Sequence, residues 1–153
     1  MEKLPRPRVL GGLTVKVQTG CGSMYVHINW HKGVPFEVFA TLGKSGGCGM
    51  GQNEAVTRGI TLGLRCGIPA SEYISQLRGI HCLSPVPFPK ETAVTSCPDA
   101  IASVLAQYCN LSMDEVVELM TKGGNGDHPP EEEESQAMIR IQELIEEREK
   151  QGL

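Results

Sequence analysis

The sequence predicts an α+β fold: a three-stranded antiparallel meander packed with helices, followed by a C-terminal helical extension. Two observations predict it. Residues 13–42 contain three runs in which apolar and polar residues alternate, and short turns join these runs. Most of residues 52–122 instead repeat apolar residues at the spacing of a helix.

The three strands are predicted over residues 13–18, 24–30 and 36–42, where every second side chain is apolar. Residues 1–12 are predicted to be an extended lead-in, because proline at two of its positions disfavours helix in the residues before it. The meander therefore begins just after this lead-in.

Four helices are predicted after the meander, over residues 52–65, 71–77, 97–108 and 112–122. Ser71 is the expected cap of the second helix, and Ser112 with Glu115 forms an S-x-x-E capping box for the fourth. In the third, Pro98 suits the first helical position, so Cys97 is expected at the capping position. A thiol is a poor cap, which indicates another purpose for this cysteine.

The C-terminal part differs in composition from the rest of the chain. Residues 123–134, with the sequence GGNGDHPPEEEE, have the composition of a linker. Residues 135–153 are predicted to form an amphipathic helix, which is suited to self-association or to docking. The predicted organisation is thus a domain over residues 13–110, a helix over 111–122, the linker and the last helix.

The charges are unevenly distributed, although the formal net charge is only −4. Of the 18 acidic residues, 12 lie in residues 111–153. The basic residues of the first 110 positions are scattered singly, which favours a solvated surface over a nucleotide or nucleic-acid site. No apolar run has membrane-spanning length and the N-terminus lacks the apolar core of a secretory signal, so a cytoplasmic protein without membrane attachment is expected.

Six cysteines in a chain of this kind indicate metal binding or redox chemistry more than a disulfide framework. Four of them lie in predicted loops or at helix starts: Cys21, Cys48, Cys82 and Cys97. Metal binding and nucleophilic attack both need a thiolate, which the N-terminus of a helix stabilises. The other two, Cys66 and Cys109, lie at predicted helix ends and are expected to be structural.

The spacing of the four cysteines leaves two interpretations open. There is no C-x-x-C pair, so a metal site would have to be assembled by the fold, and scattered buried thiols are the alternative. Four thiolates suit zinc or an iron–sulfur cluster. His81, beside Cys82, is a further candidate ligand or hydrogen-bond donor.

The motif TSCPD at residues 95–99 resembles the signature of the TSCPD domain family. The segments TGCGSMYVHIN, PFEVFATLGKSGGCG, NEAVTRGITLGLRCGIP and YISQLRGIHC also look like that family, so the resemblance covers about residues 8–108. The family is best known as the C-terminal module of adenosylcobalamin-dependent (class II) ribonucleotide reductases, and it also occurs as a short separate protein.

The resemblance implies that Cys21, Cys48, Cys82 and Cys97 are metal ligands, with zinc as the metal and an iron–sulfur cluster as the alternative. It also implies that the partner is the catalytic chain of a ribonucleoside-diphosphate reductase, an enzyme of DNA replication. The chain has no room for the reductase barrel, so it is not expected to be catalytic alone.

A second, more distant similarity is to iron–sulfur scaffold proteins of the NifU/IscU type. It rests on three sequence features: the letters CG after a predicted strand, the letters GCG before a predicted helix, and a cysteine at the start of the later helix that contains the letters DAI. That comparison matches Cys21, Cys48 and Cys97 to the scaffold cysteines and makes Cys82 an extra ligand. Ser23 stands where the scaffold has an aspartate, which favours a permanent, closed site over labile cluster assembly.

Three functional hypotheses follow. The first is a non-catalytic metal-binding accessory module that acts with the reductase in regulation, assembly or substrate delivery, and that forms a homo-oligomer or docks through its C-terminal helix. The second is an iron–sulfur cluster carrier or scaffold. The third is a thiol redox protein in which Cys97 is the nucleophile and Cys82 the resolving thiol.

Overall fold

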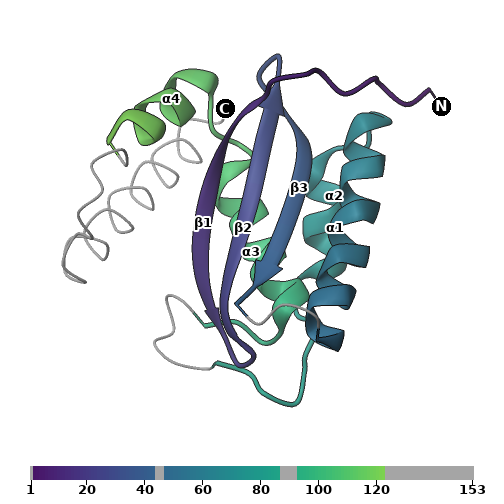
Figure 1. The fold of residues 1–153 in the computed structure, drawn as a ribbon, viewed down its shortest axis with the longest axis vertical. Coiled ribbons are helices and arrows are strands. Elements are labelled where there is room, and N and C mark those ends of the chain that lie inside the picture. The colour runs from purple at the N-terminus through teal and green to yellow at the C-terminus, as the bar shows by residue number, and fades with distance from the viewer. Residues whose placement is uncertain (1, 44–46, 87–92, 123–153) are drawn as a thin grey trace. The chain divides into compact units, whose positions relative to one another are not determined.

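The computed structural model describes residues 2–43, 47–86 and 93–122, and the first 121 residues belong to one unit. The elements in chain order are β1 (Gly11–Thr19), β2 (Gly22–His31), β3 (Val34–Leu42), α1 (Cys48–Arg65), α2 (Ala70–Leu77), α3 (Cys97–Tyr108) and α4 (Met113–Lys122). Figure 1 shows the strands as one sheet beside the helices, which confirms the predicted α+β fold. The predicted linker and last helix lie outside the described residues.

The sheet is the antiparallel meander that the alternating runs predict, in the order β1-β2-β3. Val26 in the middle of β2 lies opposite Val15 of β1 and Ala40 of β3. The turn between β2 and β3 has positive φ at both central residues, Lys32 and Gly33, as a two-residue type I′ hairpin requires. Each strand extends one or two residues beyond its predicted bounds on at least one side.

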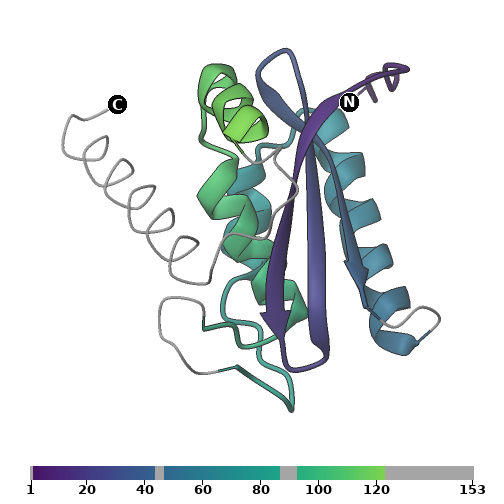
Figure 2. The same ribbon diagram turned by 60° about the vertical axis from the view of Figure 1, so that its left-hand side comes forward.

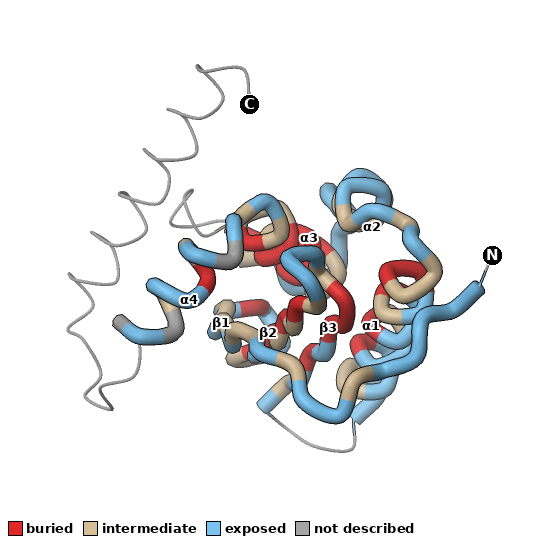
Figure 3. Tube along the Cα trace, turned by 90° about the horizontal axis from the view of Figure 1, so that it is seen from above, coloured by how far each residue is buried: buried red, intermediate tan, exposed pale blue. Residues whose placement is uncertain are grey.

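One face of the sheet is buried against the helices, as Figures 2 and 3 show. The core combines side chains of this face with apolar residues of α1, α3 and α4 and with one residue of the segment before α3: Met24, Val26, Ile28, Trp30, Val38, Ala40, Ile60, Leu64, Val94, Ala100, Ile101, Val104, Leu105, Tyr108 and Val116. Burial of such side chains is the main favourable term in folding. It fixes α3 against the sheet, and α3 carries Cys97 at its first position.

Helix α1 begins at Cys48, four residues before its predicted start, and its extended N-cap is Gly47. Glycine has low helix propensity, so the glycine-rich stretch before residue 52 pointed to a loop. Tertiary contacts override this preference, because the Leu42 N–H donates to Met50 Sδ at 3.5 Å. At the other end Gly67 has a φ of +86° and closes the helix, a role that glycine commonly has.

Of the serine caps predicted for the helices α2 and α4, one is absent and one is confirmed. Ser71 does not cap α2, because this helix begins at Ala70 with Pro69 as its N-cap, so that prediction was wrong. The capping box before α4 is confirmed: the Ser112 N–H donates to Glu115 Oε2 at 2.6 Å, and the Glu115 N–H donates to Ser112 Oγ at 3.4 Å. Among the described residues no helix is long and apolar enough to cross a membrane.

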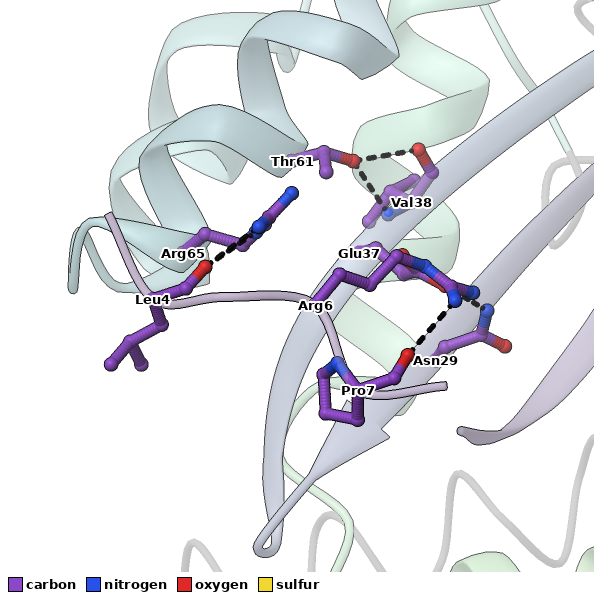
Figure 4. A network of polar contacts seen from close by, with 8 residues as sticks. All are labelled: Leu4, Arg6, Pro7, Asn29, Glu37, Val38, Thr61 and Arg65. Atoms are coloured by element: carbon purple, nitrogen blue, oxygen red, sulfur yellow. Dashed lines mark hydrogen bonds and ion pairs between the residues drawn. The ribbon is translucent and has the colours of Figure 1, made fainter. Parts of the chain in front are cut away.

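The segment before β1 is anchored by a buried carboxylate, as Figure 4 shows. Glu37 of β3 is 1% exposed, and Arg6 donates to both of its oxygens at 2.7 and 2.8 Å. Asn29 of β2 donates to the same carboxylate at 2.8 Å. Burial by itself would raise the pKa of Glu37, but these hydrogen bonds and the positive charge of Arg6 outweigh it, and the pKa is lowered.

Glu37→Gln tests this anchor. A lowered carboxyl pKa means that the stabilisation is present above the ordinary value of 4.5 and is lost as the pH falls through the lowered pKa. We expect the variant to lose about 2 kcal/mol of unfolding free energy at neutral pH, and the difference from the natural chain to shrink in acid. Urea denaturation at neutral pH and at about pH 3 measures both, and an equal deficit at the two pH values would contradict an electrostatic anchor.

Candidate metal centre

The four candidate cysteines lie in segments that meet at one end of the sheet. Figures 1 and 2 show the β1–β2 turn, the α2–α3 loop and the first turns of α1 and α3 at this end. These segments carry Cys21, Cys82, Cys48 and Cys97 respectively. The fold therefore brings residues that are far apart in the sequence to a common end, which we call the cysteine end.

Cys97 is the first residue of α3. The N-cap is Ser96, so the prediction that Cys97 would be the cap was wrong. Ser96 is buried and its hydroxyl accepts the Asp99 N–H at 3.2 Å. A serine oxygen is a better acceptor than a thiol, so the cap and the start of the helix both lie one residue earlier than the sequence suggested. Cys97 is thereby free of a capping role and lies in the first turn of α3, beside the backbone N–H groups that have no partner within the helix.

Asp99 fastens the α2–α3 loop to the start of α3. It is 5% exposed, and its two oxygens accept the N–H groups of Gly79 at 2.9 Å and Thr95 at 3.0 Å. Burial would raise the pKa of Asp99, but these backbone hydrogen bonds and the charge of Arg78 lower it. Sequence reasoning missed this role of Asp99, although a serine followed three residues later by an acid could have indicated a carboxylate that reaches back.

Further hydrogen bonds shape the loop around Cys82. The Cys82 N–H donates to the Thr95 carbonyl at 2.9 Å, and the Thr95 hydroxyl donates to the Ile80 carbonyl at 2.8 Å. The Ser84 N–H donates to Cys82 Sγ at 3.4 Å, which supplies a hydrogen bond to the sulfur. His81 is exposed, and its Nδ1 lies 2.6 Å from the Gly79 carbonyl, so this ring nitrogen contacts the loop backbone.

Thr19 connects the β1–β2 turn to Cys97. It is 3% exposed, and its hydroxyl donates to the Gly22 carbonyl at 2.8 Å and accepts the Cys21 N–H at 3.2 Å. The Cys97 thiol donates to the same oxygen at 3.8 Å. Sequence reasoning missed Thr19, since a threonine at the end of an alternating strand gives no local signal of this contact.

Close backbone packing joins the same turn to the α2–α3 loop. A Cβ atom added at Gly20 would lie 1.8 Å from the carbonyl oxygen of Ser84, so only glycine fits there. The turn that carries Cys21 thus packs directly against the loop that carries Cys82.

The sulfur atoms of three cysteines interact electrostatically. The pKa of Cys21 is raised, first by the negative charge of Cys97, then by desolvation, by a hydrogen bond with Cys97 and by the charge of Cys82. Such mutual repulsion between thiolates is what a bound cation relieves. Cys21, Cys82 and Cys97 therefore form a group, the three-cysteine cluster.

Cys48 lies at the same end but apart from this cluster. It is exposed at the first position of α1, and within the described part of the chain its sulfur has no hydrogen bond or electrostatic interaction with the other three. Over the same residues, no three His, Cys, Asp or Glu side chains stand close enough to form a ready metal site. The donor chemistry suits a soft cation, but binding one requires the sulfurs to move closer together.

The remaining cysteines differ from these four. Cys66 is half-buried at the end of α1. Cys109 packs against the core, and burial raises its pKa to about 12, which keeps it a thiol at neutral pH. A thiol in this setting fits the structural role that the sequence predicts for Cys109.

The sequence model of the TSCPD domain family matches residues 2–109. This is more than half of the chain, so the chain belongs to the TSCPD domain family, as its motifs indicated. The TSCPD domain is linked to ribonucleotide reductase. No curated protein and no solved structure matches the chain. The more distant similarity to NifU/IscU-like scaffolds is not borne out by these comparisons.

Asp99→Ala should loosen the cysteine end. The variant leaves the Gly79 and Thr95 amides without their acceptor, so we expect a loss of about 3 kcal/mol in unfolding free energy and faster hydrogen exchange at both amides. Asp99→Asn keeps one carbonyl oxygen and should have a smaller effect. Unchanged exchange at both positions in Asp99→Ala would show that the carboxylate does not hold the loop.

Proposed function

We propose that this protein is a non-catalytic, cysteine-rich metal-binding module that acts with a ribonucleotide reductase. The observation that carries the proposal is the fastening of three cysteine-bearing segments to one another at one end of the sheet, through Thr19, Asp99 and the contact of Gly20 with Ser84. Membership of the TSCPD domain family supports the class of partner.

The three-cysteine cluster would supply three ligands, and Cys48 the fourth. Glycines flank Cys48 on both sides, and Gly47 as N-cap makes no side-chain cap that would have to break if the first turn of α1 moved. Zinc bound by four thiolates would supply a closed, redox-inert cross-link between α1, α3 and the two loops. The Ser84 N–H to Cys82 Sγ would remain as a hydrogen bond to a ligand sulfur.

The environment of the buried carboxylates favours a binding role over acid–base catalysis. In the described part of the chain the buried acidic residues are Glu37 and Asp99. Glu37 is held by Arg6 and Asn29, and Asp99 by two backbone amides, and both have lowered pKa values. A general acid or base working near neutral pH needs a carboxyl pKa shifted upward.

The same loop offers a contact for the reductase. Leu83, next to Cys82, is fully exposed at 103%, and Ile80 is 41% exposed. Apolar side chains at a loop tip are typical of contact residues when the loop is held in one conformation. We assign them to docking on the catalytic chain, with a bound cation fixing the loop that presents them.

Metal content tests the proposal directly. We expect anaerobically purified chain to hold one zinc ion, and Cys21→Ser, Cys82→Ser and Cys97→Ser each to weaken zinc binding by at least about 100-fold. Cys66→Ser is the matched control and should bind normally. Chelator competition and elemental analysis measure this, and a metal-free chain with four freely reactive thiols would refute the proposal. A visible absorption band with iron and sulfide would instead favour the cluster-carrying alternative.

Leu83→Asp tests the contact with the reductase. The side chain is fully exposed, so we expect zinc content and thermal unfolding to stay as in the natural chain. Binding to the purified catalytic chain, measured by calorimetry, should weaken at least about tenfold, as for an apolar contact replaced by a charge. Thr41→Asp, at an exposed position of β3, is the control. Equal affinity of the Leu83 variant and the natural chain would remove this loop from the contact.

A further inference from the structure

The hydroxyl of Thr19 contacts two different cysteines. It accepts the backbone N–H of Cys21 at 3.2 Å and the thiol of Cys97 at 3.8 Å. Thr19 is buried and its own proton is committed to the Gly22 carbonyl, so this oxygen is a fixed point. The backbone of Cys21 and the sulfur of Cys97 are thereby both held at the same oxygen atom.

Cys82 has different partners. Its backbone N–H is bonded to the Thr95 carbonyl and its sulfur accepts the Ser84 N–H. Both contacts lie within its own loop. The interactions that raise the pKa of Cys21 follow the same pattern: Cys97 contributes charge and a hydrogen bond, whereas Cys82 contributes charge alone and the least.

We propose that Cys21 and Cys97 are an oxidisable pair that a peroxide converts into a disulfide, while Cys82 stays a thiol. This differs from the pairing of Cys97 with Cys82 that the sequence suggested. Cys21 is exposed and Cys97 half-buried, so a small oxidant reaches the pair from solvent. The disulfide itself does not depend on the proposed metal-binding function.

The chemistry balances with hydrogen peroxide as the oxidant. Cys97, as its thiolate, attacks one peroxide oxygen; an S–O bond forms, the O–O bond breaks, and the leaving hydroxide takes a proton to become water. Cys21, as its thiolate, then attacks the sulfenic sulfur of Cys97. The S–S bond forms, the S–O bond breaks and a second water leaves, so two thiols lose two electrons and two protons.

Oxidation would control the proposed metal site, and this step rests on the proposed function. A disulfide removes two of the four thiolates, and the two that remain cannot hold a closed tetrahedral site. The module would then release its cation under oxidising conditions and take it up again when a thiol reductant restores the pair.

Disulfide mapping of the natural chain tests the pairing. Reduced, metal-free full-length chain is treated with one equivalent of hydrogen peroxide, alkylated and digested with trypsin without reduction. We expect the main cross-linked peptide to join Cys21 to Cys97, and Cys82 to be alkylated. Cys97 and Cys109 lie on the same tryptic peptide, between Lys90 and Lys122, so fragmentation of that peptide identifies which of them is cross-linked. A main product joining Cys82 to either partner, or no intramolecular disulfide, would overturn the proposal.

Variants show whether Thr19 positions the pair. Thr19→Val removes the shared acceptor at nearly constant shape and should slow disulfide formation about tenfold through lost orientation, whereas Thr19→Ser should retain the natural rate. Cys82→Ser should leave the disulfide intact, and Cys66→Ser is the matched control. Circular dichroism confirms that each variant is folded before its rate is compared, and an equal rate in Thr19→Val and the natural chain counts against the positioning.

Zinc release separates this inference from the proposed function. Zinc-loaded chain is treated with peroxide in the presence of a chromogenic chelator, and we expect release in step with formation of the disulfide. A disulfide in a chain that never binds zinc refutes the metal-binding function and leaves the pair standing. A chain that binds zinc but forms no disulfide under excess peroxide refutes the Cys21–Cys97 pair and leaves the metal-binding function standing.

Discussion

A buried carboxylate at the start of α3 holds the loop that precedes this helix. Asp99 is buried and accepts two backbone amides of the loop, and each charge-assisted hydrogen bond of this kind contributes about 1.5–3 kcal/mol. Because α3 is packed on the sheet, Asp99 is held in a fixed position, and its hydrogen bonds fix the loop relative to the core. This contact also helps to place Cys82, because the Cys82 N–H donates to the carbonyl of Thr95, which Asp99 holds.

The cysteine end therefore combines a firmly packed base with three exposed cysteines and one, Cys97, that is half-buried. Its base is the apolar packing of sheet and helices, and its connections are the Asp99 contacts on one side and Thr19 on the other. Three thiols are brought near enough for the charge of one to affect another, while Cys48 stands apart at the start of α1. Such an arrangement suits a site that closes when its ligand binds and opens when its thiols are oxidised.

Local pattern was sufficient for most of the fold. Alternation located all three strands because each buries one face, and apolar spacing located the helices with a core-facing stripe. It failed where tertiary contacts overrode propensity, at the glycine-rich start of α1, and where two neighbouring residues competed for a cap, at Ser96 and Cys97. It also misplaced the cap of α2, where Pro69 rather than Ser71 precedes the helix.

The candidate site was predictable in its residue types but not in its geometry. Thiols at loops and helix starts identified the four cysteines, whereas the contacts that hold them join residues separated by up to 78 positions, as between Thr19 and Cys97. Long-range hydrogen bonds of that kind leave no periodic signal in a single sequence. The position of Cys48 outside the three-cysteine cluster could not be read from spacing for the same reason.

The most direct measurement is X-ray absorption spectroscopy at the zinc edge on anaerobically purified chain, since it counts the atoms bound to the ion. Gathering of Cys21, Cys48, Cys82 and Cys97 around one ion predicts four sulfur neighbours at about 2.3 Å. A shell made only of nitrogen and oxygen would contradict it and would leave the cysteine end without its proposed ligand.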